Sequence, residues 1–453
     1  MVLHAAFNVV DIYVVSFLSA AAINAATYGG LITALPAILS NGVGTATVAL
    51  IARAVGQGDR AAAAGIARQS MFLTLLMSVA FSLPGVVWAK ELSLFSGAAG
   101  AEVGPSTVFL AVSSGGLVTL FLMVQITAIL RGGGDGFSPM VLLVGANLLN
   151  AVLNFILVFG CPVPAGETCP AFARPVLDAI GAWVRIPRLE IAGAAWATII
   201  ARGAGAVAGV FILVAERRRI AMTLAAFRPS LSESWRLLKM GFPNSAQFFV
   251  RALAILLLMK AVSPYGEDVR AAVSIGVRYD LLALFFAMGW GVATASIVGQ
   301  CLGAGKKLRA MQTIRIAMIF DVSAMAIIGA IYFAFARPLV EFFPVNEAAA
   351  ARDRLVESAV LYLRVMVLSY PFAAVAVVVS HAMNGAGEMR TPFWIDAAGL
   401  LFLQVPACFL AARALASTHP AAVWGIVVAV QALLAALYLL ALRRRGWMRA
   451  SLE

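Results

Sequence analysis

Twelve apolar stretches, each long enough to cross a lipid bilayer, constrain the fold of this sequence more than any other feature. A helix needs about 20 apolar residues to span a hydrocarbon layer about 30 Å thick. The stretches cover approximately residues 2–21, 28–52, 69–89, 106–130, 138–159, 191–215, 241–262, 271–298, 314–336, 358–383, 392–413 and 421–442. They do not alternate polar and apolar residues as barrel strands would. The sequence therefore predicts an all-α polytopic membrane protein with 12 transmembrane helices.

The composition excludes other classes of protein. Hydrophobic residues make up 62% of the 453 residues and charged residues 12%, whereas soluble domains have roughly 45–50% and about 25%. The mean hydropathy of +0.95 agrees with this excess. A net charge of +12 would suggest a nucleic-acid partner if it lay on one folded face. The basic residues instead lie in short loops between apolar stretches, so we expect no nucleic-acid partner.

Lys and Arg residues predict the orientation in the membrane. They are concentrated in the even-numbered loops and at the C-terminus, and the largest groups are Arg217, Arg218, Arg219, Arg228, Arg236 and Lys239 and then Arg443, Arg444, Arg445 and Arg449. Positively charged loops stay in the cytoplasm. We therefore expect both termini of this multi-pass protein on the cytoplasmic side of a bacterial inner (plasma) membrane.

An internal repeat divides the chain. Residues 29–60 align with 276–307 at an offset of 247, and 132–139 align with 385–392 at an offset of 253. The matched positions include Gly29 with Gly276, Gly44 with Gly291, Gly56 with Gly303, Gly58 with Gly305, Gly134 with Gly387 and Asp135 with Glu388. Because six stretches separate the copies, the halves share one orientation, which predicts two pseudo-twofold-related six-helix bundles with a cavity between them. The predicted parts are an N-terminal bundle 1–215, a cytoplasmic basic linker 216–240, a C-terminal bundle 241–442 and a cytoplasmic tail 443–453.

Four motifs, three of them in or next to these repeats, resemble those of a known transporter family. Residues 52–59 (ARAVGQGD) and their echo 298–306 (VGQCLGAGK) look like the signature loops of the multidrug and toxic compound extrusion (MATE) family. Residues 130–135 (LRGGGD) resemble its glycine loop, and residues 8–11 (NVVD) its helix-1 motif. Family members usually have further residues before that motif. The resemblance covers nearly the whole chain and implies an ion-coupled exporter.

Asp11 is the ionisable residue that the sequence singles out first. It lies within the first apolar stretch, with Asn8 one turn before it on the same helix face. Ionisable residues inside a membrane are costly and mark ion pathways or buried pairs. A carboxyl group there can take up a proton or hold a sodium ion, and the resemblance implies that Asp11 and Asn8 belong to the cation-coupling site. A structural carboxylate that caps another helix is the alternative.

The fifth stretch carries a polar stripe of Asn147, Asn150 and Asn154 along one helix face. Three amides are too costly to face lipid, so they face other helices. We expect Asn150 and Asn154 to complete with Asp11 a site for a cation, either H⁺ or Na⁺, and we assign Asn147 to the substrate cavity. Interhelical hydrogen bonding is the alternative. Many relatives have aspartate at the position of Asn154, so its amide here favours one cation per cycle. The resemblance adds Thr198, which matches a helix-6 threonine that can supply a further oxygen.

The C-terminal half does not repeat this pattern. One branch of the family has acids in helices 7 and 10, whereas here Arg251 lies near the helix-7 position and the stretch 358–383 has no acid. We therefore expect no cation site of that kind in this half. Arg251 either pairs with an acid or faces the substrate cavity, where it would repel cationic drugs. Structural ion pairs are predicted for Arg278, Asp280, Asp321 and Asp396.

The remaining reactive residues do not predict catalysis. His residues are too scattered for a metal site, and no nucleophile lies in a pattern with a base, so we expect neither an enzyme nor a cofactor other than the coupling ion. Cys161 and Cys169 share one outside loop and are candidates for a disulfide in a bacterial periplasm. Cys301 and Cys408 lie in reduced or membrane settings.

These features predict a secondary active antiporter. It would export amphipathic organic compounds, such as drugs and toxins, in exchange for H⁺ or Na⁺ by alternating access, as a monomer in the lipid bilayer. A lipid-linked oligosaccharide flippase of the same superfamily is the alternative, because Arg251 and Arg278 would suit an anionic lipid. The count of twelve stretches and the pair Asn8 and Asp11 favour the exporter.

Overall fold

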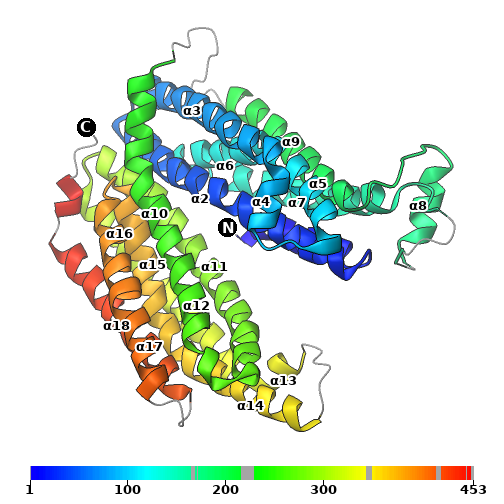
Figure 1. The fold of residues 1–453 in the computed structure, drawn as a ribbon. Helices are drawn as coiled ribbons and strands as arrows, with labels where there is room; N and C mark the ends of the chain where they lie inside the picture. The colour runs from blue at the N-terminus through cyan, green and yellow to red at the C-terminus, as the bar shows by residue number, and fades with distance from the viewer. Residues whose placement is uncertain are drawn as a thin grey trace. The chain divides into compact units, whose positions relative to one another are not determined.

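The computed structural model describes residues 2–164, 169–170, 172–215, 229–342, 349–414, 420–444 and 446–449. These residues are almost entirely helical (Figure 1), and their one strand-like pairing is an isolated bridge between Cys161 and Ile186. Ten of the described helices are long and apolar enough to cross a membrane, and one pair bent by 45° makes an eleventh span. The first predicted stretch forms α1 (Val2–Val15), which has 14 residues. The predicted all-α polytopic fold is confirmed, and the spans match eleven of the predicted stretches.

The chain packs as two units, one of residues 1–47 with 59–239 and one of residues 48–58 with 240–453. The first contains α1, most of α2 (Ala20–Gln57), α3 (Arg60–Val87), α4 (Ala89–Phe95), η1 (Gly100–Glu102), α5 (Val103–Gly115), α6 (Leu117–Gly132), α7 (Phe137–Phe159), α8 (Arg174–Gly181) and α9 (Glu190–Ala215). Within this unit α1 packs against α7 and α9, and α7 packs against α9. These three helices supply the predicted cation site.

The second unit repeats the arrangement of long helices joined by short elements. It contains most of α10 (Leu231–Ala261), η3 (Ser263–Tyr265), α11 (Glu267–Gly303), α12 (Lys307–Ala334), α13 (Ala336–Glu341), α14 (Ala349–Met366), η4 (Val367–Ser369), α15 (Tyr370–Gly385), α16 (Arg390–Asp396), a π-helical segment η5 (Ala397–Gln404), α17 (Val405–Ala414), α18 (Ala421–Arg443) and η6 (Gly446–Arg449). Within it α11 packs against α12, α14 and α15. These elements surround the second cavity described below.

Two predicted boundaries are wrong. The first helix ends at Val15 instead of near residue 21, and α2 begins at Ala20 because the Ser19 hydroxyl accepts a hydrogen bond from the Ala22 N–H (3.1 Å) and caps it. Hydropathy does not detect this break, since the residues around it are apolar. The predicted linker is also too long, because α10 begins at Leu231. Residues 216–228 of that linker lie outside the described part of the chain.

The sequence repeat corresponds to repeated local structure. Gly134 and Gly387 both adopt a left-handed backbone, with φ of 85° and 91°, which suits glycine. Oδ1 of Asp135 then accepts backbone N–H groups at the start of α7 at 2.9 and 3.0 Å. Oε1 of Glu388 accepts the backbone N–H of Thr391 at 3.0 Å at the start of α16. The repeated glycine–acid pair therefore ends one helix and caps the next in both halves.

The repeated signature loops pack against each other within the second unit. A Cβ atom on Gly56 would overlap the backbone of Gln300, and one on Gly303 would overlap the backbone of Arg53. Each glycine therefore leaves room for the backbone of the other loop. The two glycines are matched positions of the repeat, and both lie where the ends of α2 and α11 come close together.

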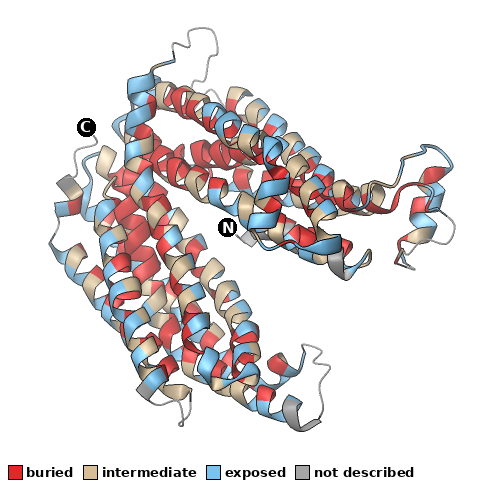
Figure 2. Cartoon of the chain, viewed as in Figure 1, coloured by how far each residue is buried: buried red, intermediate tan, exposed pale blue. Residues whose placement is uncertain are grey.

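The outer faces of the helices are apolar and exposed. In Figure 2 buried residues follow the inward faces within each unit, and exposed residues follow the outer faces. Phe211 and Phe402 are 71% and 74% exposed. Large apolar side chains exposed on long helices are expected where lipid replaces water.

Candidate functional site

A cavity of about 250 Å³ lies inside the first unit, between α1, α2, α5, α6 and α9. Its wall is mostly apolar, with hydroxyl groups from Thr33, Ser113 and Thr119 among the lining residues. The charged side chains among the described lining residues are Asp11 of α1 and Arg202 of α9. An apolar cavity with a few convergent polar groups is the usual form of a small-molecule site.

Asp11 is held by side chains from two other helices. Its Oδ2 atom accepts the hydroxyl of Thr198 at 2.7 Å, and its Oδ1 atom accepts the amide of Asn154 at 2.8 Å and that of Asn150 at 3.3 Å. Asn150 also donates to the Thr198 hydroxyl at 2.9 Å. All four residues are at most 8% exposed. The structure thus brings together Asp11, Asn150, Asn154 and Thr198, which the sequence assigned to one site.

The amide oxygens of Asn150 and Asn154 remain available in this site. Both oxygens are buried, and no donor among the described residues bonds to them. Buried polar atoms are usually hydrogen-bonded, so such a pair beside a carboxylate needs an explanation. Together with Asp11 and Thr198 they supply oxygen atoms that suit a hard monovalent cation, and the carboxylate alone suits a proton.

Local sequence explains how three helices meet here. Asn150 and Asn154 are separated by one helical turn, which places both on the same face of α7. A Cβ atom on Gly193 would overlap the backbone of Leu157 and Val158, so glycine lets α9 approach α7 closely. Thr198 follows Gly193 on α9 and reaches Asn150 as a result.

One predicted site residue lies apart from this network, and another cannot be compared with it. Asn147 is half-buried on α7, and its amide donates to the carbonyl of Leu143 at 2.7 Å. It is not among the described residues that line the cavity. Asn8 belongs to α1, but its side chain lies outside the described part of the structure.

Arg202 is the site residue that the sequence analysis missed. It lines the same cavity as Asp11, and its guanidinium lies 4.7 Å from the centre of the Phe7 ring, in a cation–π contact. Its Nε atom is buried with no hydrogen-bond partner among the described residues. The sequence feature that could have identified it is an arginine one turn after Thr198 in an otherwise apolar helix. A charged residue inside a membrane helix is itself evidence for a functional site.

In the second unit Arg251 pairs with Asp396. The Arg251 Nε atom lies 2.7 Å from Oδ2 of Asp396, and the side chains are 21% and 2% exposed. Gln247 and Tyr438 also donate to Asp396, at 2.8 and 2.7 Å. The ion pair expected for Asp396 is confirmed, and this pairing partly neutralises Arg251, which also lines the second cavity.

The expected ion pairs of Asp280 and Asp321 are wrong. Asp280 accepts hydroxyl groups from Tyr362 and Tyr370, and no Lys or Arg among the described residues lies within ion-pair distance of it. Asp321 is fully buried, and neither carboxylate oxygen has a hydrogen-bond partner among the described residues. Position in an apolar stretch does not reveal which neighbour a side chain faces.

The two cysteines of the loop after α7, which are candidates for a disulfide by their position, are free thiols in the structure. Cys161 is buried and Cys169 is half-buried. Burial raises the pKa of the Cys161 thiol, and the carboxylate of Asp178 raises it further. Among the described residues, no group of three His, Cys, Asp or Glu side chains is arranged to hold a metal ion.

Comparison with known proteins identifies the family. The MatE family model matches residues 1–156 and 243–410, which is more than half of the chain. The chain belongs to the MATE family. The match includes α1, most of α7 and the elements that line the second cavity except α18.

Individual relatives of this MATE protein are distant but cover most of it. A probable multidrug resistance protein NorM of Thermotoga maritima is 25% identical over 80% of this chain and 71% of its own. A probable multidrug resistance protein YpnP of Bacillus subtilis is 25% identical over 89% of this chain and 83% of its own. An outward-facing structure of a multidrug resistance MATE family transporter superposes with a TM-score of 0.85 at 21% identity, covering 100% of this chain and 94% of that one. At this identity the structural likeness shows the fold alone.

The family assignment settles the general class of the protein. It is a multi-pass membrane transporter of the MATE family, and members of that family are not enzymes. The comparisons do not favour the flippase alternative, because the two relatives described above are named as probable multidrug resistance proteins.

Proposed function

We propose that this chain is a secondary active antiporter that exports amphipathic organic compounds in exchange for H⁺ or Na⁺. The observation that carries the proposal is the buried hydrogen-bonded network around Asp11 at the wall of an apolar cavity. A carboxyl group in that position can change its charge, and the cavity beside it has room for an organic molecule.

The coupling follows from the partners of Asp11. When Asp11 is ionised, Thr198 and the two asparagine amides stabilise the anion. When a proton or a sodium ion neutralises it, those donors are no longer needed in the same arrangement. The ion and the substrate then stabilise different packings of α1 against α7 and α9. Binding of the ion shifts the equilibrium between these packings in one direction, and binding of the substrate shifts it in the other.

The membrane potential supplies enough energy for useful export. One positive charge that moves inward through about 100 mV releases about 2.3 kcal/mol. At about 1.4 kcal/mol per tenfold change, this supports a substrate gradient of about fifty-fold. A single coupling ion per cycle is therefore sufficient for export of an electrically neutral compound. Exchange of one coupling ion for one organic cation moves no net charge, and the concentration gradient of the ion drives it.

We also propose a membrane location, an oligomeric state and an orientation for the protein. We place it in the bacterial inner membrane as a monomer with both termini in the cytoplasm. The distribution of Lys and Arg residues among the loops supports this orientation.

Efflux of ethidium and norfloxacin from a pump-deficient bacterial host tests the proposal. The wild-type chain is expected to lower cell-associated dye, and Asp11→Asn is expected to abolish this effect because the amide cannot exchange a cation. Asp321→Asn is the matched control, since it makes the same change at a buried acid that does not line the described cavity. Efflux that persists in Asp11→Asn at equal expression would refute the coupling role.

Transport measurements in proteoliposomes identify the coupling ion. Export driven by a pH gradient in sodium-free buffer identifies H⁺, and export that requires a sodium gradient at constant pH identifies Na⁺. Export that responds to neither gradient would contradict the antiport proposal.

A further inference from the structure

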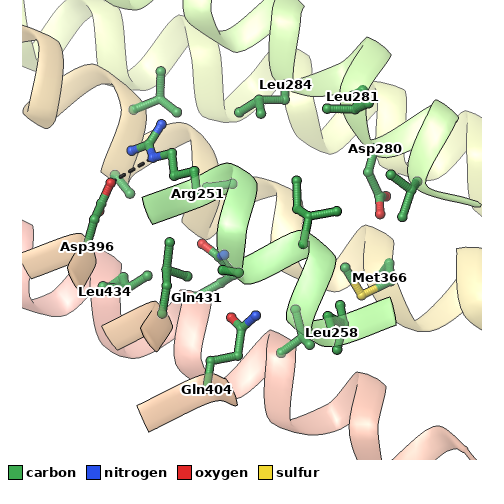
Figure 3. A pocket seen from close by; sticks show the side chains of 18 of the residues that line it. Arg251, Leu258, Asp280, Leu281, Leu284, Met366, Asp396, Gln404, Gln431 and Leu434 are labelled. Carbon is green, nitrogen blue, oxygen red and sulfur yellow. Dashed lines mark hydrogen bonds and ion pairs between the residues drawn. The ribbon is translucent and has the colours of Figure 1, made fainter. Parts of the chain in front are cut away.

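A second cavity of about 180 Å³ lies inside the second unit. Its wall is largely apolar, with Leu258, Leu281 and Leu284 among the lining residues. Figure 3 shows the ion pair of Arg251 and Asp396 on one side of this cavity and Asp280 on the other. The cavity therefore contains one acid that is already paired and one that is not.

Asp280 is held by two hydroxyl groups. The Tyr362 hydroxyl donates to Oδ2 at 2.6 Å, and the Tyr370 hydroxyl donates to Oδ1 at 2.8 Å. No cationic side chain among the described residues forms an ion pair with Asp280. The other charged or titratable groups around it on packed elements are Tyr332 on α12 and, across the cavity, Arg251 with Asp396. An ionised Asp280 would thus be an uncompensated charge beside an apolar cavity, which is costly.

The internal repeat relates this acid to the coupling site of the first unit. Within the aligned block, the offset of 247 residues pairs Asp280 with Thr33. Each of these two residues lines the cavity of its own unit. The acid of the first cavity is Asp11 on α1, and the acid of the second cavity that lacks an ion pair is Asp280 on α11, at the position that Thr33 has in the first unit.

We propose that Asp280 is a second proton-binding site, located in the C-terminal unit. Both of its oxygens accept a hydroxyl hydrogen, and each keeps a lone pair that can bind a proton. A metal ion would need several further ligands, and no group of three His, Cys, Asp or Glu side chains among the described residues is arranged to hold one. A proton needs a single carboxylate oxygen, and the tyrosine that bonds to that oxygen can rotate away.

The consequence for transport rests on the antiport function proposed above. If Asp11 and Asp280 each exchange one proton, two protons enter per cycle instead of the one predicted from the first unit alone. The proton site itself does not depend on that function, because protonation of Asp280 can be observed without any substrate.

Infrared difference spectroscopy of the full chain in liposomes tests the site directly. A pH step in sodium-free buffer is expected to produce the carbonyl band of a protonated carboxyl group that disappears in Asp280→Asn. The band should remain in Asp11→Asn and in the matched control Asp321→Asn. Tyr362→Phe is expected to keep the band and shift its frequency, because the carboxyl group loses a hydrogen bond.

Three results would overturn the proposal. One is a pH-difference spectrum of Asp280→Asn that equals that of the wild type. Another is loss of the band on addition of sodium at constant pH, which would make Asp280 a metal-ion ligand. If Asp280→Asn does not fold, the variants Tyr362→Phe and Tyr370→Phe test the proposal in its place. A carbonyl band whose frequency is unchanged in both variants would also overturn the proposal.

An equilibrium transport measurement separates this inference from the proposed function. With the membrane potential held at zero and a gradient of about one pH unit, two protons support an ethidium gradient of about 100-fold and one proton about tenfold. Asp280→Asn is expected to reduce the largest ethidium gradient that the protein can maintain from about 100-fold to about tenfold. An unchanged ethidium gradient would contradict a coupled second site. Absence of ethidium transport by the wild type would count against the proposed function alone, since the infrared band still tests Asp280.

Discussion

The hydroxyl group of Thr198 donates a 2.7 Å hydrogen bond to Oδ2 of Asp11, although the two residues are 187 positions apart in the chain. This bond connects α9 to α1 inside the first unit. It provides the direct contact between the acid that the sequence singled out and the threonine that the family resemblance added to its site. Changes at either residue should therefore affect ion coupling and stability together.

Replacing Thr198 by valine should impair both properties. The change removes a hydrogen bond to a charged group, which contributes about 1.5–3 kcal/mol, and leaves Oδ2 of Asp11 without that donor. We expect a lower unfolding temperature in detergent and roughly tenfold slower ethidium efflux. Thr198→Ser keeps the hydroxyl and should restore most of both; equal defects in the serine and valine variants would argue against the hydrogen bond.

Removing the charge of Arg202 should strengthen the binding of cationic substrates. Arg202 lines the same cavity as Asp11, so its guanidinium repels an organic cation there. Arg202→Gln is expected to lower the KM for ethidium efflux roughly fivefold, which corresponds to about 1 kcal/mol of lost repulsion. Arg202→Lys keeps the charge and should leave the KM near that of the wild type. A higher KM in Arg202→Gln would show that the guanidinium does not act through repulsion.

Breaking the ion pair of the second unit should destabilise the protein. Arg251→Met leaves Asp396 buried without its cation, a change that costs about 3–5 kcal/mol for buried pairs. We expect the lower part of this range, because Arg251 is 21% exposed. The double variant Arg251→Met with Asp396→Leu should recover part of the loss in thermal unfolding. No recovery in the double variant would mean that the pair itself is not the cause.

The close contact of the two signature loops should not tolerate a side chain. A Cβ atom on Gly303 would overlap the backbone of Arg53, which no side-chain rotation can relieve. Gly303→Ala is expected to cost about 1–3 kcal/mol and to reduce efflux. Gly65→Ala is the control, because the same substitution there meets open space inside a helix and should be neutral or stabilising by about 0.5–1 kcal/mol. Equal behaviour of the two variants in thermal unfolding would contradict the packing argument.

Much of the first-unit site was predictable from the sequence. Asn150 and Asn154 share a helix face by their spacing, and Asp11 was conspicuous as an acid in an apolar stretch. The equivalence of Gly134 and Gly387 was also visible as a repeat, and the structure supplies its reason in the capping of α7 and α16. Arg202 was not predicted as a site residue, because its place in the same cavity as Asp11 follows from the packing of α9 against α1.

The sequence by itself determined the membrane-spanning helical class, the duplication and the identity of the acid in the first helix. These depend on solvent preference and on spacing along one helix, which are properties of local sequence. Only the tertiary structure decided that Asp280 faces tyrosines instead of an arginine and that α1 stops at Val15. The reason is that hydropathy measures only the preference of a helix for lipid over water. The hydrogen-bond and ion-pair partners of a side chain depend on how its helix is rotated about its axis against the neighbouring helices.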